Sequence, residues 1–334
     1  MSARKTTQPS PSASESITGH DGTTMWSSSR IRSQKKRMLR IIQQDPVAAV
    51  QLVRESFKST NAMEFDASEV HIALLKVFTD DEVCCVEVIS SLLDAGMLSF
   101  LRDYIAGPAI LVIPQEDSDI QAIGAPQLFN GFLAAAAKLD SRRLLSEIID
   151  ELHHEPWASL WDSRAIIIRS DFKDDMLQFL ACSGIILSVI YKNCDQKDMG
   201  SANRLIDLMF FAWFHLEDSQ AETLHAANAM SRYILDGPLP VLRWPGSVAA
   251  DGELVSSLVS EYGPRELVRR IRSALGRMTE HFRDDGDAQN QEWSYYMLLM
   301  TTMLLPGICC HTKCRRFLMK YDILSAIEGH TSVH

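Results

Sequence analysis

Apolar residues recur along most of the chain at the three- and four-residue spacing that amphipathic helices show. Near the start, Leu39 and Ile42 belong to one such pattern, and Val47 and Val50 belong to the next. This spacing places the apolar side chains on one face of a helix, where they can pack against a neighbouring helix. Pro46 lies between the two patterns, and proline suits the first turn of a new helix. The pattern therefore predicts two consecutive helices, the second starting near Pro46.

Twelve further segments show the same helical spacing. Two other apolar stretches, residues 109–114 and 165–169, could form short strands, but neither has a second strand at hairpin distance. Glycine and proline are scarce for 334 residues, at 16 and 12, which favours helices over a turn-rich β fold. We predict an all-α fold with longer loops at 107–127 and 237–252. The predicted helical segments are 70–78, 83–93, 97–105, 128–139, 142–153, 174–192, 201–215, 221–235, 254–262, 265–282, 292–304 and 317–328.

The first 37 residues differ in composition from the rest of the chain. They are rich in Ser, Thr and Pro and have almost no large apolar side chains, so they cannot bury enough surface to offset the entropy of ordering. We predict a disordered tail over residues 1–37 and one helical domain over residues 38–334. Basic residues gather where the two meet, either as a solvated lead-in to the first helix or as a nuclear-import signal; they are Arg30, Arg32, Lys35, Lys36, Arg37 and Arg40.

Charge and cysteine content indicate which partners the protein can bind and in which cellular compartment it lies. The chain has 33 basic and 43 acidic residues and a net charge of −10, which argues against a broad nucleic-acid surface because phosphate binding needs clustered Lys and Arg. Its seven cysteines are odd in number, and the N-terminus lacks the apolar core of a secretory signal. Reduced thiols in an intracellular protein are the simpler interpretation. We expect a cytoplasmic protein, with the nucleus as the alternative.

Two apolar segments raise the question of a membrane. Residues 179–191 are too short to span a bilayer, and residues 293–310 reach the minimum length only by including Pro306 and Gly307 near the end. A buried helix followed by a turn is favoured for the second segment. We expect no membrane contact, and a membrane-associated helical protein stays open as an alternative.

One sequence pattern occurs four times: two bulky residues, then a residue expected to end the helix, which we call the break residue, and then a new amphipathic helix. The break residues are Gly96, Gly184, Gly263 and Asp322, and the first lies in SLLDAGMLSFL. Successive breaks are 88, 79 and 59 residues apart, and the first two separations are each about twice the ~40–47 residues of an armadillo or HEAT repeat. The chain thus resembles the armadillo-like helical repeat proteins, whose repeats carry a leucine pair, a turn glycine and then the helix that lines the concave face.

This resemblance implies an irregular α-α superhelix over residues 38–334, interrupted by the loop GPLPVLRWPGS. Stacked helical repeats leave one extended curved face that can hold a segment of another protein. The chain is also similar in texture to fungal proteins in which such a helical region precedes a MYND-type zinc finger. No MYND-type Cys-x2-Cys series occurs in this sequence. This likeness therefore identifies no zinc-binding residue here.

The C-terminal segment contains a Cys-x3-Cys-x15-His-x3-His series, formed by Cys310, Cys314, His330 and His334. A small zinc finger needs both histidines on one helix. Gly329 directly before His330 instead favours the end of a helix, and His334 is the final residue. Cys309 and Cys310 have a counterpart in Cys84 and Cys85, which lie at the equivalent place of an earlier predicted repeat without histidines nearby. We therefore expect Cys309 and Cys310 to be small packing residues and expect no zinc at this series.

Two Glu-x-x-His pairs, Glu151 with His154 and Glu222 with His225, are similar to the ligand pairs of carboxylate-bridged di-iron bundles. Pro156 follows the first pair closely and places it at a helix end, where charged groups are usually exposed to solvent. Surface charge is therefore the favoured interpretation, and a metal-dependent enzyme that uses these four residues is the alternative.

No motif of nucleophilic or phosphate chemistry is present, since the chain lacks Gly-x-Ser-x-Gly, Gly-x4-Gly-Lys-Ser/Thr and Gly-x-Gly-x-x-Gly. We assign no catalytic, cofactor-binding or metal-binding residue. The sequence predicts a non-enzymatic scaffold for a protein partner, without nucleic acid, membrane or cofactor. Two aromatic groups favour helix packing, although some of their members could line a peptide groove; they are Trp157 and Trp161, and Phe210, Phe211, Trp213 and Phe214.

Overall fold

The computed structural model describes residues 28–58, 67–107, 119–152, 156–170, 173–194, 203–216, 252–281, 301 and 304–323. Every regular element in these ranges is a helix, and none of their residues lies in a strand. The predicted all-α fold is therefore confirmed for this part of the chain. The helices are α1 Ser28–Gln44, α2 Pro46–Ser56, α3 Ala67–Phe78, α4 Val86–Asp94, α5 Met97–Ala106, α6 Asp119–Leu139, α7 Arg142–Glu151, α8 Trp157–Asp162, α9 Arg164–Ile167, α10 Lys173–Asn193, α11 Asn203–His215, α13 Gly252–Tyr262, α14 Pro264–His281 and α16 Thr312–Lys320, and residues 304–310 are also helical.

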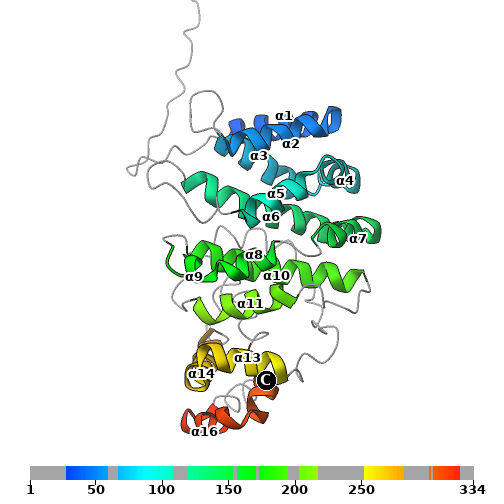
Figure 1. Cartoon of the computed structure of the whole chain (residues 1–334). Coiled ribbons are helices and arrows are strands. Elements are labelled where there is room, and N and C mark those ends of the chain that lie inside the picture. The colour runs from blue at the N-terminus through cyan, green and yellow to red at the C-terminus, as the bar shows by residue number, and fades with distance from the viewer. Residues whose placement is uncertain are drawn as a thin grey trace, which may run out of the picture.

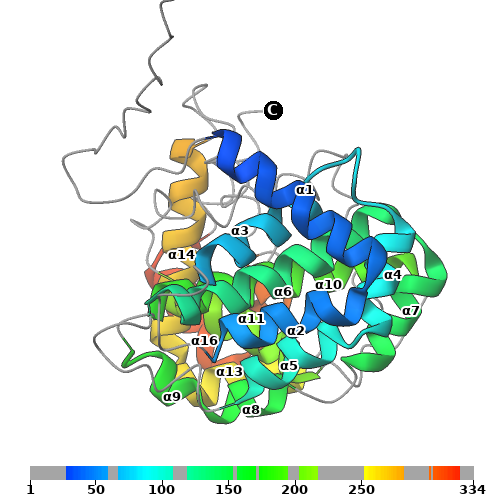
Figure 2. The same cartoon turned by 90° about the horizontal axis from the view of Figure 1, so that it is seen from above.

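The helices follow one another in chain order from one end of the molecule, at α1, to the other, at α16 (Figure 1). One row is formed by α1, α3, α6, α10 and α11, each of which packs on the next. Beside this row, α4 packs on α7, and α5 packs on α8 (Figure 2). The three consecutive helices α3, α4 and α5 are therefore covered by the next three, α6, α7 and α8, in the same order.

The described helices share one hydrophobic core, in which aromatic rings join neighbouring layers. The ring of Phe78 in α3 meets that of Phe132 in α6 edge-on, with centroids 5.8 Å apart. Phe129, also in α6, meets Trp157 of α8 at 6.1 Å and Phe179 of α10 at 5.9 Å. Burial of each such ring stabilises the fold by roughly 1.5–3 kcal/mol, and edge-to-face pairs add to this. The core thus connects layers that lie far apart in the sequence.

Helix starts and breaks agree with the sequence at several positions. α2 begins at Pro46, and the Asp45 carboxylate before it accepts a hydrogen bond from the Ala48 amide at 3.0 Å, which satisfies one unpaired donor of the first turn. Gly96 lies between α4 and α5, and Gly263 lies between α13 and α14. Both have φ of +80°, a left-handed conformation that favours glycine. These two break residues are therefore confirmed.

Asp322 is the third confirmed break residue. Its φ of +51° is tolerated by Asp because the short side chain can bond locally. α16 runs from Thr312 to Lys320, so the helix predicted over 317–328 starts earlier than expected and is interrupted at Tyr321 and Asp322; residues 324–328 lie outside the described residues. Residues 304–310 are helical through Pro306 and Gly307, where the sequence predicted a turn.

Gly184 is the one break residue that the sequence predicted wrongly, because it lies inside the continuous helix α10. A Cβ atom at this position would lie 2.2 Å from Cγ of Met209 in α11. The glycine therefore permits the close approach of two helices rather than a turn. On the other side of α10, the hydroxyl of Ser183 donates a hydrogen bond to Oδ1 of Asn130 in α6 at 2.7 Å, so one short stretch of α10 contacts both neighbours.

Three other element boundaries differ from expectation. α1 begins at Ser28, before the expected domain start at residue 38, so the basic stretch belongs to this helix. α6 begins at Asp119, inside the loop predicted for 107–127. The strand candidate at 165–169 overlaps α9 and its following turn. The segments 109–114, 221–235, 237–251 and 292–300 lie outside the described residues.

One helix in the described ranges is long and apolar enough to cross a membrane, over Lys173–Tyr191. Of this window, 71% is buried inside the protein, because α10 packs against α6, α7 and α11. Packing within the core accounts for its apolar length.

Candidate functional site

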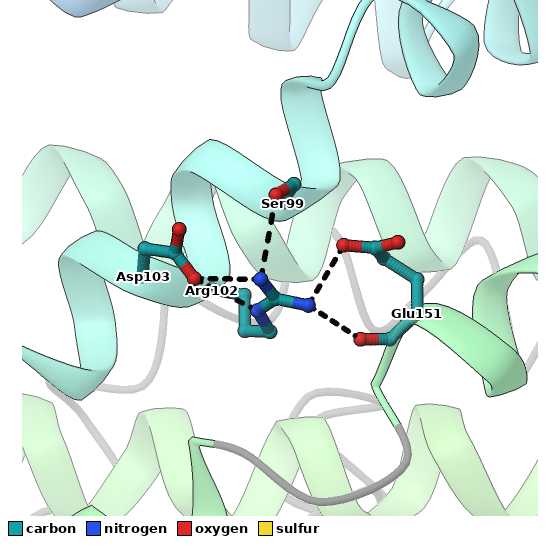
Figure 3. Close-up of polar contacts among 4 residues, drawn as sticks. All are labelled: Ser99, Arg102, Asp103 and Glu151. Carbon is teal, nitrogen blue, oxygen red and sulfur yellow. Dashed lines mark hydrogen bonds and ion pairs between the residues drawn. The ribbon is translucent and has the colours of Figure 1, made fainter.

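Arg102 of α5 joins that helix to the end of α7 (Figure 3). Its Nη1 donates to the carboxylate of Glu151 at 2.7 Å and to the main-chain carbonyl of the same residue at 2.9 Å. Within α5, Nε donates to Asp103 at 2.9 Å and Nη2 donates to the hydroxyl of Ser99 at 3.4 Å. The last carbonyls of a helix have no partner within it, so Arg102 completes the C-terminal end of α7.

This arrangement decides the role of Glu151, one of the residues of the Glu-x-x-His alternative. Its carboxylate is held by a guanidinium, and the residue links α5 to α7. His154, Glu222 and His225 lie outside the described residues. In the described ranges, no three His, Cys, Asp or Glu side chains are placed to hold a metal ion. The metal-dependent enzyme therefore gains no support from Glu151.

The cysteines of the C-terminal Cys/His series lie in different environments. Cys310 is exposed, whereas Cys314 is fully buried; His330 and His334 lie outside the described residues. The packing role predicted for Cys309 and Cys310 is wrong, because both are exposed. The helical residues 304–310 bury Leu304 and Ile308, which leaves Cys310 on the opposite side. Burial raises the pKa of the Cys314 thiol and so disfavours the thiolate that zinc requires.

Ser56 and His71 form a buried pair that has the distance of a nucleophile and its base. The hydroxyl of Ser56 lies 2.9 Å from Nε2 of His71, and it donates a hydrogen bond to the Val53 carbonyl at 2.6 Å. A hydroxyl has one proton to donate, so His71 must donate from Nε2 to Ser56. A general base would instead accept the serine proton. Both residues are buried, and the pair is therefore part of the core.

The neutral state of His71 follows from its surroundings. The ring stacks on Phe57 at a centroid distance of 4.5 Å, and a Cβ atom at Gly124 of α6 would lie 2.4 Å from Nδ1. Desolvation lowers the pKa of His71 to about 4, because a charged imidazolium is costly in such an environment. This histidine fills a tight site between α3 and α6 and stays uncharged near pH 7.

We expect the protein to lose stability as the pH falls from 7 to 5. In this range the unfolded chain protonates His71 near pH 6.5, whereas the folded protein, with a pKa of about 4, does not. The unfolded state then binds more protons, and the free energy of unfolding falls by about 2 kcal/mol through this residue. Urea denaturation at the two pH values measures the change. His71→Gln should reduce the pH dependence of the free energy of unfolding by that amount. His215 is left in place in this variant, so its own contribution to the pH dependence should remain and serves as an internal reference. An unaltered pH dependence in this variant would contradict the assignment.

An accessible cluster lies where α8, α9, α11 and α13 meet, and we name it the Trp161 cluster. The half-buried indole of Trp161 has the guanidinium of Arg164 over it at 4.2 Å and that of Arg204 at 5.4 Å. Nε of Arg164 lies 3.1 Å from the carboxylate of Glu261, and Nη1 of Arg204 lies 3.0 Å from that of Asp207. The cluster consists of these five residues, and its cations are held in place by ion pairs and by the ring.

A second group of side chains borders the cluster. Phe214 stacks on Tyr262 with centroids 3.9 Å apart, and His215 lies 5.6 Å from the ring of Tyr262. Desolvation lowers the pKa of His215 to about 4 and raises the pKa values of Tyr262 and of Asp207. Perturbed groups that gather at one place mark a candidate functional site.

The aromatic residues that the sequence analysis singled out differ in how deeply they are buried. Trp157, Phe210, Phe211 and Trp213 belong to the core, and their packing role is confirmed. Trp161 and Phe214 are only partly buried, and both lie at the junction just described. The arginines were missed, because the ion pair of Arg164 is made with a residue 97 positions away.

The Trp161 cluster has to be interpreted from its own residues. No protein-family model, no curated protein and no solved structure matches the chain. The geometry provides a partly exposed indole, two oriented guanidinium groups and a stacked aromatic pair at the junction of four helices.

Proposed function

We propose that the chain is an armadillo-like α-solenoid that binds a segment of a partner protein and catalyses no reaction. The order of packing supports this, since α3, α4 and α5 are covered in turn by α6, α7 and α8. Three-helix units that stack in register are the building principle of armadillo repeats. α6 begins at Asp119 and α3 at Ala67, so the units are longer than the usual repeat, and the solenoid is irregular.

The Trp161 cluster is the observation that carries the proposal. Tryptophan and arginine are the side chains most enriched at binding hot spots. Here the ring of Trp161 is partly exposed, and Arg164 and Arg204 are already oriented over it. A partner would lose little side-chain entropy in this site, because the ion pairs to Glu261 and Asp207 hold both arginines in place.

The two arrangements that resemble chemistry favour binding over catalysis. Ser56 and His71 are buried, and the serine donates its proton to a backbone carbonyl. Glu151 is occupied by Arg102. The membrane-associated alternative would need α10 to face lipid, and this helix is mostly covered by its neighbours.

Photocrosslinking in native extract tests the proposal with the full chain. A benzophenone amino acid at Ala158, one turn before Trp161 on α8 and exposed, should crosslink one discrete protein. The control position is Val47 of α2, which is 64% exposed and lies near the other end of the stack. Adding Trp161→Ala to the Ala158 chain should abolish the product. Identical products from both positions, or a product that persists in Trp161→Ala, would contradict the proposal.

A further inference from the structure

The helices at the C-terminal end of the stack concentrate positive charge. α14 and α16 together contain nine of the 33 basic residues but only two of the 43 acidic ones. The two helices pack against each other at the end opposite α1 (Figure 1). The chain is acidic as a whole, but this end is strongly basic. The helix α1 at the other end is basic too, with six basic residues and no acidic one, and the exposed Met319 described below distinguishes the α14–α16 end from it.

Three arginines of α14 lie on its solvent side, whereas Arg270 donates to carbonyls at the end of α11. Arg265, Arg269 and Arg272 are exposed and follow one another at helical spacing, while Leu267 and Ile271 point into the core. α16 repeats the arrangement around its buried Cys314. We name the exposed set the basic end surface; it consists of Arg265, Arg269, Arg272, Lys313, Arg315, Arg316 and Lys320.

Tyr321 joins the two halves of this surface. Nε of Arg265 in α14 donates a hydrogen bond to its hydroxyl at 3.2 Å. Nζ of Lys320, the last residue of α16, lies 6.0 Å from the centroid of the same ring. Positive charges from both helices thus meet at one side chain.

Several of these cations have no counter-charge among the described residues. Within those ranges, the side chains of Arg272, Lys313 and Arg315 form no ion pair or hydrogen bond, whereas Arg269 is paired with Glu266 at 2.7 Å. Met319 lies on α16 one turn after Arg315 and is 75% exposed. Unpaired cations around an exposed apolar side chain suit a ligand that is both acidic and apolar.

We propose that the basic end surface binds an acidic peptide segment, which places one large apolar side chain on Met319. This inference rests on the proposed scaffold function and gives the chemistry of one partner segment. An acidic peptide is favoured over nucleic acid because the patch is small and the remaining chain holds 41 of the 43 acidic residues, which would repel a long polyanion. At physiological ionic strength, salt screens charge interactions beyond about 8 Å. A short acidic segment in contact with the patch is therefore still attracted by it.

Fluorescence anisotropy with the full chain tests this. The probe is a short fluorescein-labelled peptide of Asp and Glu residues around a central Phe. Substituting Arg272→Gln, Lys313→Gln and Arg315→Gln together should raise the Kd about ten-fold or more. The matched control is Arg32→Gln, Lys36→Gln and Arg40→Gln on α1, which changes net charge equally at the other end and should leave the Kd unchanged. Circular dichroism checks that both variants keep their helix content.

Met319→Ser separates the apolar contact from charge. It should weaken binding of the Phe probe several-fold and leave a probe with Gly in its place unaffected. Equal losses in the α1 and α14–α16 variants, or tighter binding of an oligothymidylate than of the peptide at the same salt, would overturn the proposal. So would binding that appears only after Asp284→Asn, Asp285→Asn and Asp287→Asn, since the chain's own acidic stretch would then be the occupant. A failed titration together with a Trp161-dependent crosslink would reject this inference and retain the scaffold function.

Discussion

Gly184→Leu should lower the free energy of unfolding by about 3 kcal/mol or more. Even the Cβ atom of a new side chain would lie 2.2 Å from Cγ and 2.4 Å from Sδ of Met209. Met209 is 1% exposed, so it has no open space into which it can move, and α10 and α11 would have to separate. Urea denaturation followed by circular dichroism measures the loss.

Gly276→Ala is the matched control, because this glycine also lies inside a helix. It is exposed on α14, and nothing lies within 4 Å of the position that its Cβ would take. Alanine there should stabilise the protein by roughly 0.5–1 kcal/mol through backbone entropy alone. A Gly184→Leu variant as stable as the wild type would contradict the close contact between α10 and α11.

Arg270→Ala should cost about 2 kcal/mol and loosen the C-terminal helices. The guanidinium of Arg270 in α14 donates to the Trp213 carbonyl from Nε at 3.0 Å and from Nη2 at 2.9 Å, and to the Leu216 carbonyl at 2.7 Å. These carbonyls at the end of α11 would lose a charged donor. Hydrogen exchange should become faster in α13 and α14 than in α3 and α6.

Arg272→Ala, two residues further along α14, is the control for this prediction. Arg272 is exposed and forms no ion pair with another described residue, so its removal should change stability by less than about 0.5 kcal/mol. Arg270→Lys should restore only part of the loss, because lysine lacks the planar fork that reaches two carbonyls. Equal effects of Arg270→Ala and Arg272→Ala would show that the contact with α11 contributes nothing.

The helices could be predicted from the sequence because each must bury one face. Apolar residues therefore recur along the chain with a period of about 3.6 residues. Gly96 and Gly263 were predicted as breaks for a local reason, since their φ values favour glycine. Gly184 was misjudged because the atom that requires it belongs to Met209 on another helix. A local pattern does not distinguish a glycine that turns the chain from one that admits a neighbour.

The candidate site was only half predictable for the same reason. Trp161 stands out in the sequence as one of few large aromatic residues, but its partners Arg164 and Arg204 come from two other helices. The role of Glu151 depends on Arg102, 49 positions earlier. The environments of Cys310 and Cys314 were not predictable from their closeness in sequence, since Cys310 is exposed and Cys314 is buried. The protein partner and the cytoplasmic location stay predictions.

Stacking of the helices in chain order, on which the scaffold function depends, is tested most directly by crosslinking mass spectrometry of the monomer with a short amine-reactive reagent. Lys36 in α1 should link to Lys76 in α3, because the two helices pack together and Lys35 pairs with Asp80 just after α3. No intramolecular link should join Lys35 or Lys36 to Lys313 or Lys320, which lie on helices at opposite ends of the stack (Figure 1). Mixing isotope-labelled and unlabelled protein identifies links between molecules. Intramolecular links between α1 and α16 would contradict the stacked arrangement.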